Sequence, residues 1–440
     1  MTNDANLSDA NSTKKSSGLT LRVEPLKAAA LVERAKEGAR SMLQATSAQK
    51  NKTLVSIAEL LDDKSEAILE ANAKDLAAAE ENGLSGAMLE RLKLDDNGLG
   101  KLKKALHEIA AAADPVGEIL GVSSRPSGIQ VGRMRVPLGV LLMIYESRPN
   151  VTIDAAALCL KAGNAVILRG GKEARHSNAA LAAVVQQALG EAGLSENGVV
   201  FVDTPERGVL YALLRSSGDI DLAIPRGGTS LIDAVNEHAR VPVLQHYQGI
   251  CHVYVHQDAD LEMAVDVVVN AKTHRPGVCN AMEGIVIDEK VADEFLPVVT
   301  AALKEKGVKL YGCEKSVAIC PADVDKASAE HFDTEFLDLE CVLKVVADVA
   351  EAKDFLDEHG SRHTESIITN NHAVAMDFLR SVDASCVMVN ASTRFNDGGE
   401  LGLGAELGIS TTKLHAYGPM GLDELCTKKF IVLGHGEVRS

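Results

Sequence analysis

The sequence predicts an α/β protein with two parallel-sheet domains and a small β arm. Strands and helices alternate between residues 138 and 243, and a second alternating series begins at Cys251. Such alternation is typical of parallel sheets that are covered by helices on both faces. The segment 115–137 alternates apolar and polar residues around a Pro-Ser-Gly turn, which is the pattern of a β-hairpin. At 440 residues, the chain is long enough for two or three domains.

The first quarter of the chain is predicted to be a tail followed by helices. Residues 1–24 are rich in Ser, Asn, Thr and Asp and cannot bury enough apolar area to become ordered, so we expect a flexible polar tail. Between residues 25 and 113, apolar side chains such as Leu54, Ile57 and Leu61 recur at helical spacing. The hairpin that follows is interpreted as a packing arm, with an oligomer contact as the functional alternative.

The two α/β series are predicted from apolar runs that alternate with amphipathic segments. The first has strands at 139–145, 165–168, 199–202 and 220–224, and helices at 150–161, 176–189, 205–215 and 229–238. The second has strands at 252–256, 284–288, 365–369 and 386–389, and helices at 263–272 and 292–306. A last strand at 430–433 is expected to pair with the hairpin. Parallel sheets bind ligands at the carboxyl ends of their strands.

The composition excludes several classes of function. The formal net charge is −17, Trp is absent and aromatic residues make up 3%, so binding to nucleic acid or to an anionic membrane surface is disfavoured. No stretch approaches ~20 apolar residues, and the polar start of the chain does not resemble a secretory signal. None of the eight cysteines forms a CxxC pair. We therefore expect a cytoplasmic enzyme with reduced thiols.

Motifs for phosphate and metal binding are sparse. A GxGxxG fingerprint follows none of the early strands. Gly227-Gly228-Thr229 instead follows the fourth strand and opens a helix, where backbone N–H groups are suited to hold phosphate. On this string alone, a simple glycine turn is the favoured alternative. No HExxH string or paired histidine spacing is present, so no metal site is expected.

Two residues have settings suited to acyl chemistry. Cys279 follows a Pro-Gly turn that is expected to place it at the start of a helix, with His274 and Arg275 nearby. A helix N-terminus and a cation both lower the pKa of a thiol, and the thiolate is the nucleophile; a buried structural cysteine is an equal alternative. Asn150 lies on the loop after the first strand, where an amide can donate to an oxyanion. Taken alone, Asn150 is better explained as an ordinary N-cap.

Four strings carry a resemblance to a known family. They are residues 137–174 (PLGVLLMIYESRPNVTIDAAALCLKAGNAVILRGGKEA), 224–232 (IPRGGTSLI), 270–287 (NAKTHRPGVCNAMEGIVI) and 389–429. Together they resemble the aldehyde dehydrogenase superfamily over nearly everything after about residue 25. The resemblance implies an aldehyde-dehydrogenase-like fold with two Rossmann-like α/β domains and a small β-arm oligomerisation element.

The resemblance also implies how the chain is divided. A cofactor-binding domain is expected from residues 25–114 and 137–249, with 389–412 returning to it. A catalytic domain is expected from residues 250–388, and an oligomerisation arm from residues 115–136 and 413–440. Residues 1–24 look like an extension outside the family pattern.

Several residues take family roles through the resemblance. Cys279 stands where the family keeps its nucleophile, and Asn150 matches the asparagine that forms the oxyanion hole with the Cys279 backbone N–H. Arg169 and Lys172 fall where the family binds the adenosine ribose. Lys172 replaces a Glu of NAD-preferring relatives, and a cation suits the 2′-phosphate of NADP. Glu335 resembles the residue that holds the nicotinamide ribose.

Two further features fit this assignment. Gly227, Gly228 and Thr229 match the turn beside the cofactor pyrophosphate. Residues 238–257, where hydrolytic members of the superfamily carry a general-base Glu, contain no Asp or Glu. Without that base, water is not activated to attack a thioester, which suits transfer of the acyl group to or from phosphate.

The resemblance is strongest to members that act on the acyl phosphate of glutamate. It implies NADPH-dependent reduction of L-glutamyl 5-phosphate to L-glutamate 5-semialdehyde and phosphate through a cysteine thioester, the second step of proline biosynthesis. Substrate cations are expected among Arg148, His274, Arg275 and Arg394, with surface salt bridges as an even alternative for each. A homo-oligomer and glutamate 5-kinase are the expected partners. A CoA-dependent acylating dehydrogenase and a catalytically silent oligomeric scaffold remain as alternatives.

Overall fold

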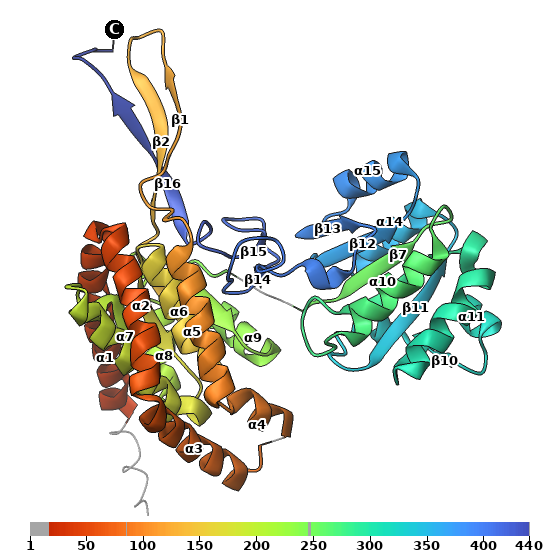
Figure 1. Cartoon of the computed structure of the whole chain (residues 1–440), viewed down its shortest axis with the longest axis horizontal. Coiled ribbons are helices and arrows are strands. Elements are labelled where there is room, and N and C mark those ends of the chain that lie inside the picture. The colour runs from red at the N-terminus through yellow and green to blue at the C-terminus, as the bar shows by residue number, and fades with distance from the viewer. Residues whose placement is uncertain (1–16, 85, 245–247, 440) are drawn as a thin grey trace, which may run out of the picture. The chain divides into compact units, whose positions relative to one another are not determined.

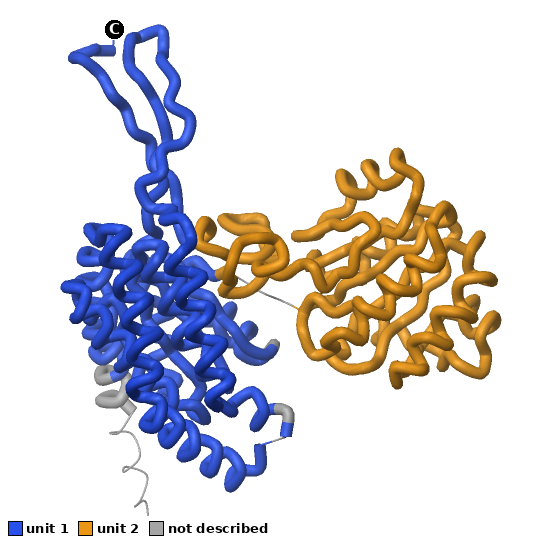
Figure 2. Tube along the Cα trace, in the orientation of Figure 1, with its two compact units in different colours: residues 1–243, 425–440 blue, residues 244–424 orange. Residues whose placement is uncertain are grey.

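The chain folds into two compact α/β units. A computed structural model describes residues 17–84, 86–244 and 248–439 (Figure 1). Unit 1 comprises residues 1–243 and 425–440, and unit 2 comprises residues 244–424 (Figure 2). Within the described ranges, no helix is long and apolar enough to cross a membrane.

Unit 1 is built around a four-stranded parallel sheet with the strand order β5-β4-β3-β6. The strands are β3 (Val140–Tyr145), β4 (Ala165–Arg169), β5 (Val199–Phe201) and β6 (Leu222–Arg226). The α-helices are α1 (Ser17–Gln44), α2 (Ser47–Asp63), α3 (Ser65–Glu81), α4 (Gly86–Leu92), α5 (Asp96–Ala111), α6 (Asn150–Lys161), α7 (Arg175–Glu191), α8 (Arg207–Leu214) and α9 (Thr229–His238). Short 3₁₀ helices are η1 (Lys172–Ala174) and η2 (Glu196–Gly198). Every residue of β3 is buried, as expected for a strand covered on both faces.

The N-terminal helix corrects one prediction and confirms another. Because α1 begins at Ser17, the predicted tail 1–24 is wrong for residues 17–24, and residues 1–16 lie outside the described residues. Ala28, Val32 and Ala35 of α1 belong to the core of the unit-1 sheet. Once such a helix is docked, adding a turn costs less free energy than nucleating one. The helical region predicted for 25–113 is confirmed as α1–α5.

A three-stranded antiparallel sheet, the β arm, completes unit 1. It consists of β1 (Ile119–Ser124), β2 (Gln130–Pro137) and β16 (Cys426–Leu433), with β2 in the centre. β16 pairs with β2 along its whole length, so the predicted hairpin and its pairing with the C-terminal strand are confirmed. In this register, the Arg133 guanidinium lies 4.6 Å from the centroid of the Phe430 ring.

Unit 2 contains a seven-stranded parallel sheet with the strand order β10-β9-β11-β8-β7-β12-β13. Its strands are β7 (Cys251–Val255), β8 (Met282–Asp288), β9 (Lys309–Gly312), β10 (Asp325–Lys326), β11 (Glu340–Val346), β12 (Thr364–Ile368) and β13 (Cys386–Val389). The helices are α10 (Leu261–Thr273), α11 (Glu289–Glu305), α12 (Glu314–Ile319), α13 (Ala329–Phe332), α14 (Val349–His359), α15 (His372–Ser381) and the 3₁₀ helix η3 (Thr393–Phe395). The short strands β14 (Ile409–Ser410) and β15 (Gly418–Pro419) form a separate pair.

The core of unit 2 has two parts, one on each face of its sheet. Val253 and Val255 of β7 belong to one cluster of buried apolar side chains, whereas Tyr254 belongs to the other. Successive side chains of a strand point to opposite faces, so this division follows directly from the sequence HVYV. Both faces are therefore covered, in agreement with the burial of all five residues of β7.

The division between the units differs from the prediction at the C-terminal side. Residues 389–424 belong to unit 2, so the expectation that 389–412 returns to the cofactor-binding domain is wrong, as is the placement of 413–424 in the arm. Hydrogen bonds tie η3 to unit 2, because Thr393 Oγ1 donates to Asn280 O and Asn396 Nδ2 donates to Thr364 Oγ1, both at 2.8 Å. Of the predicted arm segment 413–440, residues 425–440 belong to unit 1, together with the rest of the β arm.

Candidate active site

The predicted cofactor residues of unit 1 gather at one edge of its sheet. β4, β3 and β6 are neighbouring parallel strands, so the loops after their carboxyl ends lie at the same edge. Asn150 follows β3, Lys172 follows β4, and Gly228 follows β6. This is the edge at which parallel sheets bind ligands.

Asn150 is the first residue of α6 and is not its N-cap. The N-cap position is occupied by Pro149, so the N-cap explanation is wrong. Asn150 Nδ2 donates to Asp154 Oδ2 at 3.0 Å, one helical turn further on. An amide nitrogen carries two N–H groups, so a second remains for an oxyanion. Burial raises the pKa of Asp154 to about 6, while the bond from Asn150 and the charge of Arg226 oppose that rise.

Arg169 fits an anionic ligand. It ends β4, and its guanidinium donates to Gly170 O at 3.1 Å and to Pro205 O at 3.4 Å. Its buried Nε has no hydrogen-bond partner among the described residues, and burial lowers its pKa. Lys172, the exposed first residue of η1, lies on the loop that follows. A half-buried guanidinium with an unused donor is an arrangement that a phosphate would satisfy.

The glycine turn before α9 already holds an anionic group. The Gly228 N–H donates to Glu146 Oε2 at 3.0 Å, directly before α9 begins at Thr229. A Cβ at Gly227 would lie 2.5 Å from the same oxygen, so only glycine allows this approach. Glu146 thus occupies the place at a helix N-terminus where phosphate oxygens bind well. The turn fits the pyrophosphate of a dinucleotide.

In unit 2, the predicted nucleophile lies in a turn. Cys279 stands between α10 and β8, and the helix predicted to begin beside it is absent, because residues 279–280 form a turn that leads into β8. Its side chain is half-buried. The backbone is held closely: Cys251 Sγ donates to Cys279 O at 3.2 Å, and a Cβ at Gly249 would lie 2.0 Å from that carbonyl oxygen. Only glycine therefore fits at position 249.

Cations converge near this thiol. Arg394 Nε donates to His274 Nδ1 at 3.4 Å. Burial lowers the pKa of Arg394, and the charge of Arg275 lowers it further, whereas Asp397 and the thiol of Cys279 raise it. Three of the four predicted substrate residues, two arginines and one histidine, are therefore neighbours in unit 2. The fourth, Arg148, lies in unit 1, on the loop between β3 and α6.

Glu335 lies on the loop between α13 and β11 and contacts the same glycine as the nucleophile. Its Oε1 accepts a hydrogen bond from the Gly249 N–H at 2.9 Å. Burial raises the pKa of Glu335, while this hydrogen bond and the charge of Lys272 oppose the rise. Sequence reasoning missed Lys272 and its buried partner Glu283, which bond at 2.7 Å. A signal was available for Glu283, which is a charged residue within the apolar run 281–287, whereas Lys272 lies among polar residues.

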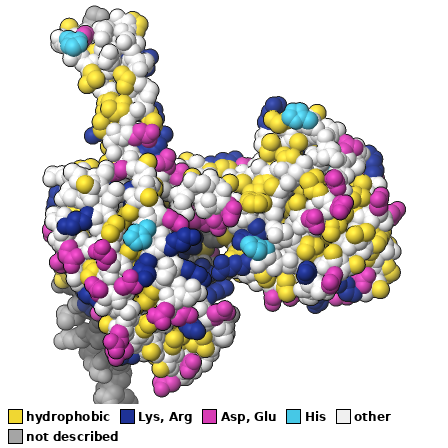
Figure 3. All heavy atoms as spheres, in the orientation of Figure 1, with side chains coloured by type: hydrophobic (Ala, Val, Ile, Leu, Met, Phe, Trp, Pro, Cys, Tyr) yellow, Lys and Arg dark blue, Asp and Glu magenta, His cyan; other side chains and the backbone are white. Residues whose placement is uncertain are grey.

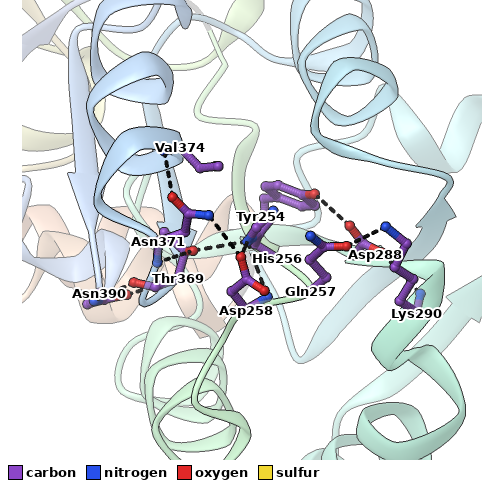
Figure 4. A network of polar contacts seen from close by, with 10 residues as sticks. All are labelled: Tyr254, His256, Gln257, Asp258, Asp288, Lys290, Thr369, Asn371, Val374 and Asn390. Carbon is purple, nitrogen blue, oxygen red and sulfur yellow. Dashed lines mark hydrogen bonds and ion pairs between the residues drawn. The ribbon is translucent and has the colours of Figure 1, made fainter.

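These groups lie at the amino ends of three adjacent strands. Gly249 precedes β7, Cys279 precedes β8, and Glu335 precedes β11, and these strands are consecutive in the sheet. The predicted site residues of unit 2 therefore do not lie at the carboxyl ends of its strands, where parallel sheets usually bind ligands. The carboxyl ends of β7 and β12 instead carry a polar network (Figure 4), in which His256 Nδ1 lies 3.0 Å from Thr369 Oγ1.

Residues 12–333 match the family model described as "Aldehyde dehydrogenase family", so the chain belongs to that family. A γ-glutamyl phosphate reductase from Desulfotalea psychrophila is 53% identical over 92% of this chain and 97% of its own length. One from Aquifex aeolicus is 49% identical over 93% and 95% of the two chains. The crystal structure of γ-glutamyl phosphate reductase from Thermotoga maritima has a TM-score of 0.92 at 43% identity, covering 95% of this chain and 100% of that one. Within the aldehyde dehydrogenase family, the chain belongs with the γ-glutamyl phosphate reductases.

We expect Asp154→Asn to remove a pH-dependent loss of stability. Burial raises the pKa of Asp154 to about 6, whereas an unfolded aspartate titrates near ~3.9. Ionisation is thus less favourable in the folded protein, so the wild type loses stability relative to the variant as the pH rises from about 4 to about 6. Urea unfolding of both proteins across this range measures the difference, and a difference that does not change with pH would contradict the assignment.

Proposed function

We propose that the chain reduces L-glutamyl 5-phosphate to L-glutamate 5-semialdehyde with NADPH, releasing phosphate, in the cytoplasm as the second step of proline biosynthesis. The observation that carries the proposal is the half-buried thiol of Cys279 with Arg275, Arg394 and His274 as its neighbours. Those cations suit an anionic leaving group. The names of relatives at about half identity over nearly the whole chain support the substrate.

The first half of the reaction forms a thioester. The Cys279 thiolate attacks the acyl carbon of the substrate, and a C–S bond forms while the carbonyl oxygen becomes an oxyanion. The Cys279 backbone N–H is the proposed main-chain donor to that oxyanion, and Asn150 is the proposed side-chain donor, as the family resemblance implies. The oxyanion then reforms the carbonyl, the bond from carbon to the phosphate oxygen breaks, and phosphate leaves with both electrons. Arg275 and Arg394 are proposed to stabilise the departing charge, and Arg148 of unit 1 is a further proposed substrate residue.

The second half converts the thioester to the aldehyde. Hydride for the thioester carbon is supplied by the reduced nicotinamide when it is bound. The resulting oxyanion is stabilised by the same proposed donors, and its collapse breaks the C–S bond and regenerates the thiolate. One proton is consumed for each acyl phosphate reduced. Residues 238–257 contain no carboxylate, so the segment supplies no base to direct water at the thioester.

Arg169, Lys172, Gly227, Gly228, Thr229 and Glu335 are the residues proposed to hold the cofactor. The guanidinium of Arg169 and the exposed ammonium of Lys172 supply positive charge for a 2′-phosphate. Gly228 and α9 supply the N–H groups for the pyrophosphate in place of Glu146. Glu335 accepts from the nicotinamide ribose hydroxyls.

Partners are proposed on two grounds. The β arm exposes Ile119, Val122, Phe430, Val432 and Leu433 (Figure 3), and exposed apolar side chains gathered on one element mark an interaction surface. A second copy of the chain is the proposed partner at this surface.

Because acyl phosphates hydrolyse readily in water, we also propose glutamate 5-kinase as the partner that supplies the substrate.

The function is tested by kinetics of Cys279→Ala. We expect the NADP-dependent, phosphate-dependent oxidation of the semialdehyde to fall by at least about 10³-fold, because the variant cannot form the thioester. Cys313→Ala, which removes another half-buried thiol, should leave the rate unchanged. Near-normal activity of Cys279→Ala would contradict the proposal. Wild-type activity that responds to CoA but not to phosphate would instead favour a CoA-dependent acylating dehydrogenase.

Cofactor preference is tested at Lys172. We expect Lys172→Glu to raise the KM for NADP by about 10- to 100-fold, because a charge-assisted hydrogen bond contributes about 1.5–3 kcal/mol. The KM for NAD should change little or fall. Lys306→Glu, at an exposed lysine of unit 2, is the matched control. Equal effects of Lys172→Glu on both cofactors would show that this lysine does not contact the 2′-phosphate.

A further inference from the structure

A buried ion pair joins the two ends of the loop that carries Cys279. Lys272 lies in the last turn of α10 and Glu283 near the start of β8. Their side chains bond at 2.7 Å and have exposed fractions of 0% and 1%. The residues between them include the nucleophile and the cations before it. The pair therefore fixes where this loop, residues 273–282, leaves the helix and enters the sheet.

Stability alone does not explain a buried ion pair. Removing two charges from water is costly, and replacement of such a pair by apolar residues of similar volume is often neutral or stabilising. Lys272 follows the apolar run 267–269 and Glu283 precedes the apolar run 285–287, although both segments also contain other polar residues. An apolar pair would fit the same surroundings, so another contribution of the charged pair has to be sought.

The second oxygen of Glu283 reaches the loop of Glu335. Glu283 Oε1 accepts a hydrogen bond from the Leu337 N–H at 3.4 Å. Leu337 has a φ of +54°, a left-handed conformation that is uncommon for a non-glycine residue and needs support from its surroundings. A Cβ at Gly277 would lie 3.6 Å from Leu337 O, so the Leu337 backbone lies against the nucleophile loop. The two loops are packed together over the ion pair.

A second path returns from Glu335 to the nucleophile. Glu335 accepts from the Gly249 N–H, and Gly249 lies against the Cys279 carbonyl. Lys272 also acts on Glu335 directly, because its charge opposes the rise in the Glu335 pKa. Cys279 and Glu335 are thus linked on one side through Gly249 and on the other through the ion pair.

We propose that the Lys272–Glu283 pair is a positioning element that holds the loops of Cys279 and Glu335 in one arrangement. The inference rests on the proposed function in one respect, the role of Glu335 at the cofactor ribose. Neither charged residue touches the reacting atoms. Because the same pair supports both loops, its loss changes the reactivity of the thiol and the affinity for the cofactor together.

The test uses two variants of the full chain. Lys272→Met/Glu283→Leu replaces both charges with apolar groups and removes the acceptor for the Leu337 N–H. Glu283→Gln keeps a carbonyl acceptor for Leu337 but removes the negative charge. The readouts are the rate of Cys279 alkylation by iodoacetamide, followed by peptide mass spectrometry because the chain has eight cysteines, and the dissociation constant of NADPH, followed by its fluorescence.

We expect the double variant to fold, to change the alkylation rate at least about 10-fold and to weaken NADPH binding about 10-fold, since small misplacements of catalytic groups have effects of that size. Glu283→Gln should change both readouts in the same direction as the double variant, by about 3- to 10-fold. The matched control is Lys50→Met/Asp114→Leu, which replaces a buried ion pair of unit 1 and should change neither readout.

Both readouts within about 2-fold of wild type in the folded double variant would overturn the proposal, as would a change in alkylation with unaltered NADPH binding. If the double variant does not fold, Glu283→Gln decides by the same criteria. Absence of phosphate-dependent activity in the wild type would contradict the proposed function instead. Thiol alkylation and NADPH binding do not depend on the substrate, so the two failures are distinguishable.

Discussion

The backbone of Gly249 lies against the carbonyl group of Cys279, and the proposed chemistry of unit 2 depends on this approach. A methyl group at position 249 would overlap the carbonyl oxygen, at 2.0 Å. The thiol of Cys251 donates to the same oxygen, and the Gly249 N–H is held by Glu335. The nucleophile, the start of β7 and the proposed ribose-binding carboxylate are therefore fixed by one short segment of backbone. A turn held in this way keeps its geometry without the support of a helix.

Local charge at the site differs from that of the whole chain. The formal net charge is −17, yet the guanidinium groups of Arg275 and Arg394 lie close enough in unit 2 for each charge to act on the other and for the Cys279 thiol to act on Arg394. Burial lowers the pKa of Arg394, and the charge of Arg275 lowers it further, because both a loss of water and a nearby like charge disfavour a cation. Such an arrangement is favourable when an anion is shared among the cations. Because the chain as a whole is acidic, a phosphorylated substrate would bind most favourably at these cations.

Much of the fold can be predicted from local sequence patterns, and the predictions that differ from the structure do so for identifiable physical reasons. The apolar run before Asn150 predicts β3 because a central parallel strand is buried on both faces. The helix predicted beside Cys279 is absent because a Pro-Gly pair also suits a turn into a strand. The placement of 389–412 depends on hydrogen bonds to Asn280 and Thr364, distant in sequence. Glu283 can be recognised in the sequence as a charged residue in an apolar run. Its pairing with Lys272 could not be predicted, because the pairing depends on how α10 packs against β8.

The central claim is that Cys279 carries the acyl group and that water does not remove it. The most direct measurement is the mass of the Cys279 peptide after incubation with L-glutamate 5-semialdehyde and NADP without phosphate. The account predicts formation of one NADPH per site and a γ-glutamyl adduct on Cys279, which added phosphate then removes. Continued NADPH formation without phosphate, or an adduct on a different cysteine, would contradict it.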